Sequence, residues 1–138
     1  MSTAAHRREF PATPASAAAA RRFVESVLAG TELDHVAYPA TMLVSELVTN
    51  AILHTGTPLE VVVIPDGPRL RVEVHDGSAQ MAVRKHYSDM SGTGRGLMLV
   101  ERMAAEWGCD RTADGKVVWF ELDGAVAPMF DLFGVDAL

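Results

Sequence analysis

A helical repeat of apolar residues in the first half of the chain constrains the fold more than any other feature. Leucine, valine, alanine and isoleucine recur there at spacings of three and four residues, at Leu43, Val44, Leu47, Val48, Ala51 and Ile52. Such a stripe predicts a helix whose apolar side packs against a core. The helix follows Pro39, and we expect it to end near Thr55-Gly56, because glycine commonly terminates helices.

Weaker patterns predict the elements on either side of this helix. A first helix is expected to start at Thr13-Pro14 and to stop at Gly30. A β-branched run over residues 59–64 and an alternating run over residues 70–75 flank the turn cluster of residues 65–68. Two such runs around a turn predict an antiparallel hairpin with one buried face.

The second half of the chain predicts a long loop, a third helix and a second hairpin. The loop spans residues 77–94. The helix opens at Gly96 and stops at Gly108, and its apolar side carries Leu97, Val100, Met103, Ala104 and Trp107. Residues 109–113 and 117–122 flank Asp114-Gly115, which is a hairpin signal. Helices and hairpins in this order predict an α+β fold, a two-layer sandwich in which a mixed, mostly antiparallel sheet carries helices on one face.

The length of 138 residues fits a single domain. Residues 1–12 show no periodicity, so we predict a disordered leader there and place the domain at residues 13–123. Residues 124–138 form a mildly apolar C-terminal tail. The sequence leaves open whether this tail caps the sheet or contributes to an interface.

Charge and cysteine content disfavour several classes of protein. The net charge is −6 with scattered lysines and arginines, so nothing favours direct contact with nucleic acid. Cys109 is the only cysteine, which leaves no thiol cluster for zinc. The N-terminus lacks a signal-like pattern, and no run approaches the roughly twenty apolar residues of a membrane span. We therefore expect a cytoplasmic protein without membrane contact.

Three polar features are candidates for a functional site. Glu46, Asn50 and His54 lie four residues apart along one edge of the apolar stripe, where a carboxylate can act as a base and an amide oxygen can bind Mg²⁺. Asp76 directly follows a strand, where its carboxylate can accept a hydrogen bond from an exocyclic amine. Simpler interpretations are a solvated helix flank for the first feature and a strand-ending turn for Asp76.

The third feature is the glycine-rich segment of residues 92–96, just ahead of a predicted helix. Free amide groups and the positive end of the helix dipole can bind phosphate oxygens at such a place. The segment is neither a Walker loop nor a dinucleotide fingerprint. The alternative interpretation is a flexible hinge.

The order of these features resembles one known superfamily. Residues 46–54 look like the N box of GHKL ATPases, residues 74–78 look like their G1 box and residues 92–97 look like their G2 box. The short chain and the strand at residues 115–122 are similar to the single-domain actinobacterial branch, which groups with the anti-sigma-factor serine/threonine kinases. The resemblance implies the Bergerat, or histidine-kinase-like ATPase, fold.

The resemblance also implies roles for the matched residues, with ATP and Mg²⁺ as cofactors. Glu46 would activate the attacking hydroxyl or water, Asn50 would hold Mg²⁺, and Asp76 would recognise the adenine amino group. The other nucleotide-binding positions would be His54, Ser78, Gly92, Thr93, Gly94, Arg95, Gly96 and Leu97. The three glycines would cover the phosphates. Ser78 stands where the superfamily usually has a second G1 glycine, and Arg95 is either a phosphate contact or an exposed arginine.

The function implied by this resemblance is a serine/threonine protein kinase. It would phosphorylate an anti-sigma antagonist and otherwise hold a sigma factor inactive, and a homodimer is a further expectation because members of that family often pair. The alternative is a regulatory binding module that responds to ATP without significant turnover. A histidine-kinase catalytic domain fits less well, because no phosphoacceptor helix pair accompanies it.

Overall fold

In the part of the chain that the structure describes, five strands form one sheet in the order β1-β2-β3-β5-β4, and every pairing between neighbours is antiparallel. The structure is a computed structural model that describes residues 4–78 and 100–125. Along the chain the named elements are β1 (His6–Phe10), α1 (Ala15–Leu28), the 3₁₀ turn η1 (Asp34–Val36), α2 (Ala37–Thr55), β2 (Leu59–Asp66), β3 (Arg69–Asp76), β4 (Glu106–Arg111) and β5 (Lys116–Asp123).

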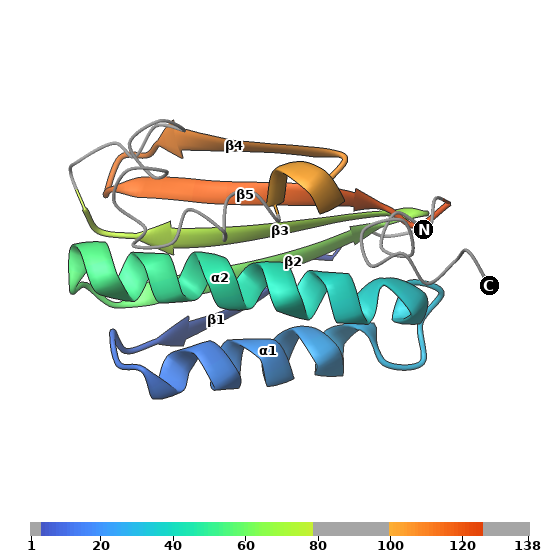
Figure 1. Ribbon diagram of the computed structural model, residues 1–138, viewed down its shortest axis with the longest axis horizontal. Helices are drawn as coiled ribbons and strands as arrows, with labels where there is room; N and C mark the ends of the chain where they lie inside the picture. The colour runs from blue at the N-terminus through green and yellow to red at the C-terminus, as the bar shows by residue number, and fades with distance from the viewer. Residues whose placement is uncertain (1–3, 79–99, 126–138) are drawn as a thin grey trace.

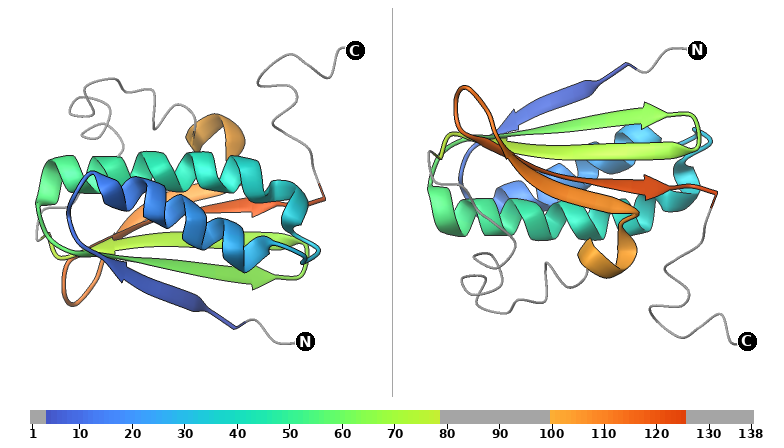
Figure 2. Two further views of the ribbon diagram at one scale, coloured as in Figure 1. Left: turned by 90° about the horizontal axis from the view of Figure 1, so that it is seen from below. Right: turned by 90° about the horizontal axis from the view of Figure 1, so that it is seen from above.

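Both long helices cover the same face of the sheet, side by side (Figures 1 and 2). On β3 the residues alternate between the two faces, and the buried ones are Leu70, Val72, Val74 and Asp76. Their register partners on β5 include Val118 and Phe120, which are also buried. The core therefore lies between the helices and one side of the sheet. This confirms the predicted α+β sandwich.

The apolar stripe predicted from the sequence is the buried side of α2. Leu43, Val44 and Val48 have no exposed surface. The helix ends at Thr55, and Gly56 follows with φ 70°, the left-handed conformation that glycine adopts without strain. The predicted end of this helix is confirmed. Its start lies before Pro39, which sits in the first turn, where a missing N–H costs no helical hydrogen bond.

The stretch from Asp34 to Thr55 is long and apolar enough to cross a membrane by length and composition, contrary to the expectation from the sequence. However, 56% of its most apolar window is buried inside the structure. This stretch is long and apolar because α2 is the central helix of the core, with apolar residues on much of its circumference.

The first helix begins one residue later than predicted. Ala15 is its first residue, and Pro14 occupies the cap position without a side-chain hydrogen bond to the backbone. Instead of capping the helix with its hydroxyl, Thr13 uses its carbonyl oxygen to accept the N–H of Ser16 at 2.9 Å. At the other end, Gly30 lies two residues beyond Leu28 with φ 77°, so it follows the helix as expected.

The prediction of a disordered leader is wrong for the residues that form β1. His6–Phe10 pairs with β2 along its whole length. Four of these five residues are exposed, so the segment shows no apolar alternation that could have revealed it. Phe10 is the buried exception, and its ring packs edge-on against Phe23 with centroids 6.2 Å apart. Backbone pairing and this one aromatic contact hold the strand in place.

The predicted third helix is too long at its C-terminal end. Residues 100–103 are helical, and Val100 and Met103 lie in the same core as α2, but Trp107 and Gly108 belong to β4. Trp107 packs against the core from β4. Its apolar side chain also fits the helical spacing of the residues before it, which is why the helix was predicted to extend this far. A Cβ on Gly108 would lie 2.8 Å from Cζ2 of Trp119, so glycine here makes room for an indole.

Both predicted hairpins are present. β2 and β3 pair from Leu59 with Asp76 to Asp66 with Arg69, around a turn that contains Gly67 at φ 61°. The second hairpin joins β4 to β5. Of the C-terminal tail, only Gly124 and Ala125 lie within the described residues.

Candidate functional site

The polar line on α2 runs along its buried flank. Asn50 is 4% exposed, while Glu46 and His54, one turn away on either side, are half-buried. The Nδ2 atom of Asn50 is buried and has no hydrogen-bond partner among residues 4–78 and 100–125. A buried amide group without a partner is uncommon in folded proteins and indicates a place where a ligand completes the hydrogen bonding. Asn50 is the residue of this line whose surroundings most favour a bound ligand.

Glu46 has a carboxylate that takes part in no hydrogen bond or ion pair among residues 4–78 and 100–125. It is therefore available to accept a proton. Within the described residues, no group of three histidine, cysteine, aspartate or glutamate side chains could hold a metal ion. Mg²⁺ is usually held by one or two protein oxygens together with water and substrate phosphates, so Asn50 beside Glu46 fits that chemistry.

Asp76 is placed by the alternation of β3 on the helix-facing side at the strand's C-terminal end. Its side chain is 1% exposed and that of Lys116 is 3% exposed. The Lys116 ammonium donates to both carboxylate oxygens, at 3.1 Å to Oδ1 and 2.9 Å to Oδ2. Asp76 and Lys116 are also direct register partners on β3 and β5. The antiparallel pairing therefore creates a buried ion pair at the predicted adenine-binding position.

The G1-like segment closes over this ion pair. The backbone N–H of Ser78 donates to Oδ1 of Asp76 at 2.8 Å. The carboxylate thus accepts hydrogen bonds both from a charged side chain and from the backbone. A buried carboxylate is stable only when it is paired and hydrogen-bonded in this way. The position of Asp76 is consequently fixed before any ligand binds.

A hydroxyl link ties the end of α2 to the end of β3. Thr57 receives a hydrogen bond on its hydroxyl oxygen from the N–H of Gly77, at 3.0 Å. The hydroxyls of Thr55 and Thr57 lie 3.2 Å apart, and the N–H of Thr57 donates to the Thr55 hydroxyl at 3.1 Å. The helix that carries Asn50 and the strand that carries Asp76 are thereby connected at the same end of the molecule (Figure 1).

The turn between β4 and β5 packs against the same strand end. A Cβ on Gly115 would lie 2.0 Å from the carbonyl oxygen of Asp76 and 2.8 Å from Cα of Gly77. No side chain fits into that space, so only glycine permits this approach. The approach brings the first residue of β5, Lys116, alongside Asp76.

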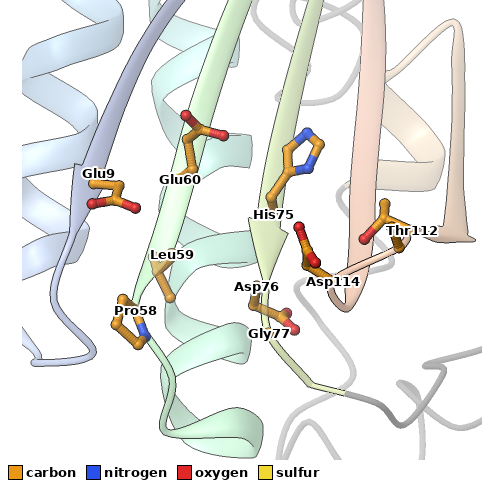
Figure 3. A pocket seen from close by; sticks show the side chains of 10 residues that line it. Glu9, Pro58, Leu59, Glu60, His75, Asp76, Gly77, Thr112 and Asp114 are labelled. Carbon is orange, nitrogen blue, oxygen red and sulfur yellow. The ribbon is translucent and has the colours of Figure 1, made fainter.

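A pocket of about 370 Å³ opens on the other face of the sheet beside these residues (Figure 3). Glu9, Glu60 and His75 form a row across β1, β2 and β3, because they are successive register partners. The complete lining is Glu9, Pro58, Leu59, Glu60, His75, Asp76, Gly77, Thr112, Ala113 and Asp114. It contains neither Glu46 nor Asn50. The carboxylates in this lining disfavour phosphate groups.

A ladder of charged side chains runs along that face from His75, which lines the pocket, toward the opposite end of the strands. Arg71 donates to Glu73 at 2.7 Å and to Glu121 at 3.1 Å, and its guanidinium lies 4.2 Å from the ring centroid of Trp119. Burial acts to raise the pKa of Glu73, but hydrogen bonds from His75 and Arg71 outweigh it and hold that pKa below its usual value. These pairs stabilise the sheet at some distance from Asn50.

The structure brings only part of the predicted site into view. Glu46, Asn50 and His54 lie on α2 and Asp76 and Ser78 at the end of β3, as the sequence pattern placed them. The remaining predicted positions lie outside the described residues: Gly92, Thr93, Gly94, Arg95, Gly96 and Leu97. The roles of all these residues stay predictions.

Sequence reasoning missed Lys116. The residue begins an alternating strand whose inward positions are otherwise Val118, Phe120 and Leu122, so a lysine in that series was an available signal. A charged residue at an inward position needs a partner of opposite charge. The identity of that partner depends on the register of β3 and β5, which the sequence alone does not specify.

Comparison with known proteins gives one family. A model described as "Histidine kinase-like ATPase domain" matches residues 10–122. The match spans every named element except most of β1 and the last residue of β5, and it includes α2, Asp76 and Lys116. None of the curated proteins matches the chain.

Proposed function

Because this chain belongs to the histidine kinase-like ATPase domain family, which supports ATP binding, we propose that it binds ATP with Mg²⁺ and transfers the γ-phosphoryl group to a serine or threonine of a partner protein. By resemblance, that partner is an anti-sigma antagonist in the cytoplasm, and the phosphorylation regulates a sigma factor. The observation that carries the proposal is the buried Nδ2 donor of Asn50, which has no hydrogen-bond partner among the described residues and so favours an acceptor oxygen of a bound nucleotide, one helical turn from the Glu46 carboxylate.

The proposed site has two ends, one that recognises the adenine base and one that binds Mg²⁺ and the phosphates. Asp76 accepts a hydrogen bond from the adenine amino group and so fixes the base. Asn50 is the residue that would hold Mg²⁺, and bound Mg²⁺ neutralises charge on the phosphate oxygens. The Thr55, Thr57 and Gly77 link keeps these two ends at a fixed separation.

Glu46 is the general base of the proposal. As the γ-phosphorus forms a bond to the acceptor hydroxyl oxygen, its bond to the bridging oxygen breaks and ADP leaves. The hydroxyl proton passes to the Glu46 carboxylate. Phosphoryl transfer demands mainly positioning and charge neutralisation, so few protein groups suffice.

A second function, an ATP-responsive binding module with little turnover, is favoured by the ion pair of Asp76 with Lys116. An adenine base that forms a hydrogen bond with the Asp76 carboxylate alters the buried ion pair between β3 and β5. Binding energy that differs between two arrangements of these strands would change the surface offered to a partner.

Calorimetry followed by a phosphorylation assay tests the proposal. We expect wild type to bind ATP in the presence of Mg²⁺, Asp76→Asn to lose binding of both ATP and ADP, and Asn50→Ala to lose the dependence on Mg²⁺. Labelled ATP is then added with candidate antagonist proteins. We expect label transfer in wild type and in Glu25→Gln, an exposed carboxylate control on α1, but not in Glu46→Gln.

Each negative result has a separate meaning. Binding of ATP without transfer to any candidate protein favours the binding module. Transfer that survives in Glu46→Gln contradicts the role of the base. Absence of ATP binding in wild type rules out both functions.

A further inference from the structure

We propose that Lys116 is a second residue that recognises the adenine base. The Lys116 ammonium would donate a hydrogen bond to the ring nitrogen N1, while the adenine amino group donates one to the Asp76 carboxylate. The inference rests on the proposed binding of ATP. It concerns Lys116, whose position was set by the register of β3 and β5.

The hydrogen bonds of Lys116 leave one donor unused. An ammonium group has three N–H donors. Two of them are directed at Oδ1 and Oδ2 of Asp76. Among the described residues, no other hydrogen bond or ion pair of this side chain is found. Since the Lys116 side chain is 3% exposed, the third N–H also has little access to water.

The carboxylate of Asp76 leaves one acceptor position unused. Its two oxygens offer about four acceptor positions. Among the described residues, Oδ1 accepts from Lys116 and from the N–H of Ser78, whereas Oδ2 accepts from Lys116 alone. One further hydrogen bond can therefore be made at Oδ2. The ion pair thus presents a free acceptor beside a free donor, on atoms 2.9 Å apart.

Adenine has the complementary arrangement on its Watson–Crick edge. The exocyclic amine donates a hydrogen bond, and the adjacent ring nitrogen N1 accepts one. Proteins that read an exposed base commonly bind this edge. A lone aspartate would satisfy the amine and leave N1 without a partner. Asp76 with Lys116 satisfies both atoms, and the charge on the ammonium strengthens its hydrogen bond.

A series of nucleotides tests this pairing on the wild-type protein. Calorimetry is performed with Mg²⁺ and ATP, with 1-deaza-ATP, in which a C–H replaces N1, and with 7-deaza-ATP, in which N1 is kept. We expect 1-deaza-ATP to bind at least about tenfold more weakly than ATP, because a charge-assisted hydrogen bond is lost. We expect 7-deaza-ATP to bind about as tightly as ATP.

Two variants then assign the effect to Lys116. Lys116→Met keeps the length of the side chain and removes its donors, so ATP and 1-deaza-ATP should bind equally. Arg69→Met removes a cation at the opposite end of β3 and should keep the tenfold difference. Circular dichroism establishes that each variant is folded. The wild-type nucleotide series decides by itself if Lys116→Met does not fold.

Several results would overturn the inference. Equal binding of ATP and 1-deaza-ATP by wild type means that nothing reads N1, even though loss of binding in Asp76→Asn would still support the proposed function. A difference that persists in Lys116→Met assigns N1 to another group. Tighter ATP binding by Lys116→Met means that the lysine obstructs the base. Absence of ATP binding in wild type rejects the proposed function and this inference together.

Discussion

Gly115 lies so close to the backbone of Asp76 that a Cβ at position 115 would stand 2.0 Å from the Asp76 carbonyl oxygen. The contact is between two backbones, so no side chain can rotate to relieve it. Any larger residue at position 115 must displace the end of β3 or the turn that follows β4. The geometry of the ion pair between Asp76 and Lys116 therefore depends on a neighbouring glycine.

Gly115→Ala should destabilise the protein and weaken ATP binding together. Overpacking of this kind costs about 1–3 kcal/mol, and contact with rigid backbone places the expected loss at the upper end. Gly77→Ala is the matched control for stability, because its Cβ would lie at an ordinary 3.6 Å from Thr57. Thermal unfolding of both variants checks the prediction, and an equal melting temperature for the two would contradict it.

Lys116→Met should unfold more easily than wild type by about 3–5 kcal/mol, since it leaves the Asp76 carboxylate buried without its counter-charge. The double variant Asp76→Asn with Lys116→Met should recover part of this loss, because no buried charge remains. Arg7→Met breaks an exposed pair with Glu60 at 3.4 Å and should cost less than about 1 kcal/mol. Urea unfolding measures all three. Similar losses in Lys116→Met and Arg7→Met would mean that water reaches Asp76.

Asn50→Ala should cost little stability in the absence of nucleotide. The variant removes a buried Nδ2 donor that has no hydrogen-bond partner within the described part of the chain, which offsets the packing lost with the side chain. Leu47→Ala, on the same helix and 2% exposed, should cost about 2–5 kcal/mol. Differential scanning calorimetry without ligand compares them. A loss in Asn50→Ala as large as that in Leu47→Ala would show that the amide is satisfied in the free protein.

Acid should destabilise wild type more than Glu73→Gln. The pKa of Glu73 is lower in the folded protein than its ordinary value of 4.5, so the unfolded chain takes up the proton first as the pH falls. The stabilisation is fully present above pH 4.5 and is lost as the pH drops through the folded-state pKa. For a partly exposed pair, we expect a difference in melting temperature of about 2 °C between pH 7 and pH 3.

The exposed Glu25 on α1 supplies the control for that measurement. Glu25→Gln should follow the wild-type acid profile. If Glu73→Gln also follows it, the hydrogen bonds from His75 and Arg71 do not hold the Glu73 carboxylate in its charged form in solution.

Local patterns were sufficient to predict α2 and both hairpins. The end of α2 at Thr55 and the turn around Gly67 depend on residues a few positions apart, so sequence spacing reveals them. β1 was missed because its stability comes from pairing with β2, about fifty residues further along the chain. Trp107 was assigned to a helix because its apolar side chain satisfies both a helical and a strand pattern.

The same distinction separates the predicted and missed parts of the candidate site. Glu46 and Asn50 follow from the helical period alone, and Asp76 follows from the end of an alternating strand. The ion pair with Lys116 requires the register between β3 and β5, and the contact of Gly115 requires the shape of a turn in three dimensions. These features depend on long-range packing, and no local motif encodes them.

The pairing of β3 with β5 has a consequence for the length of the chain that connects these two strands. Asp76 and Lys116 are 40 positions apart, yet they face one another at the end of β3 and the start of β5. The entropy lost in closing a loop grows only with the logarithm of its length, so even doubling the connection costs only about 0.6 kcal/mol. Added length between the two strands is thus tolerated by the sheet wherever it leaves β4, which pairs with β5, and the core residues Val100 and Met103 in place.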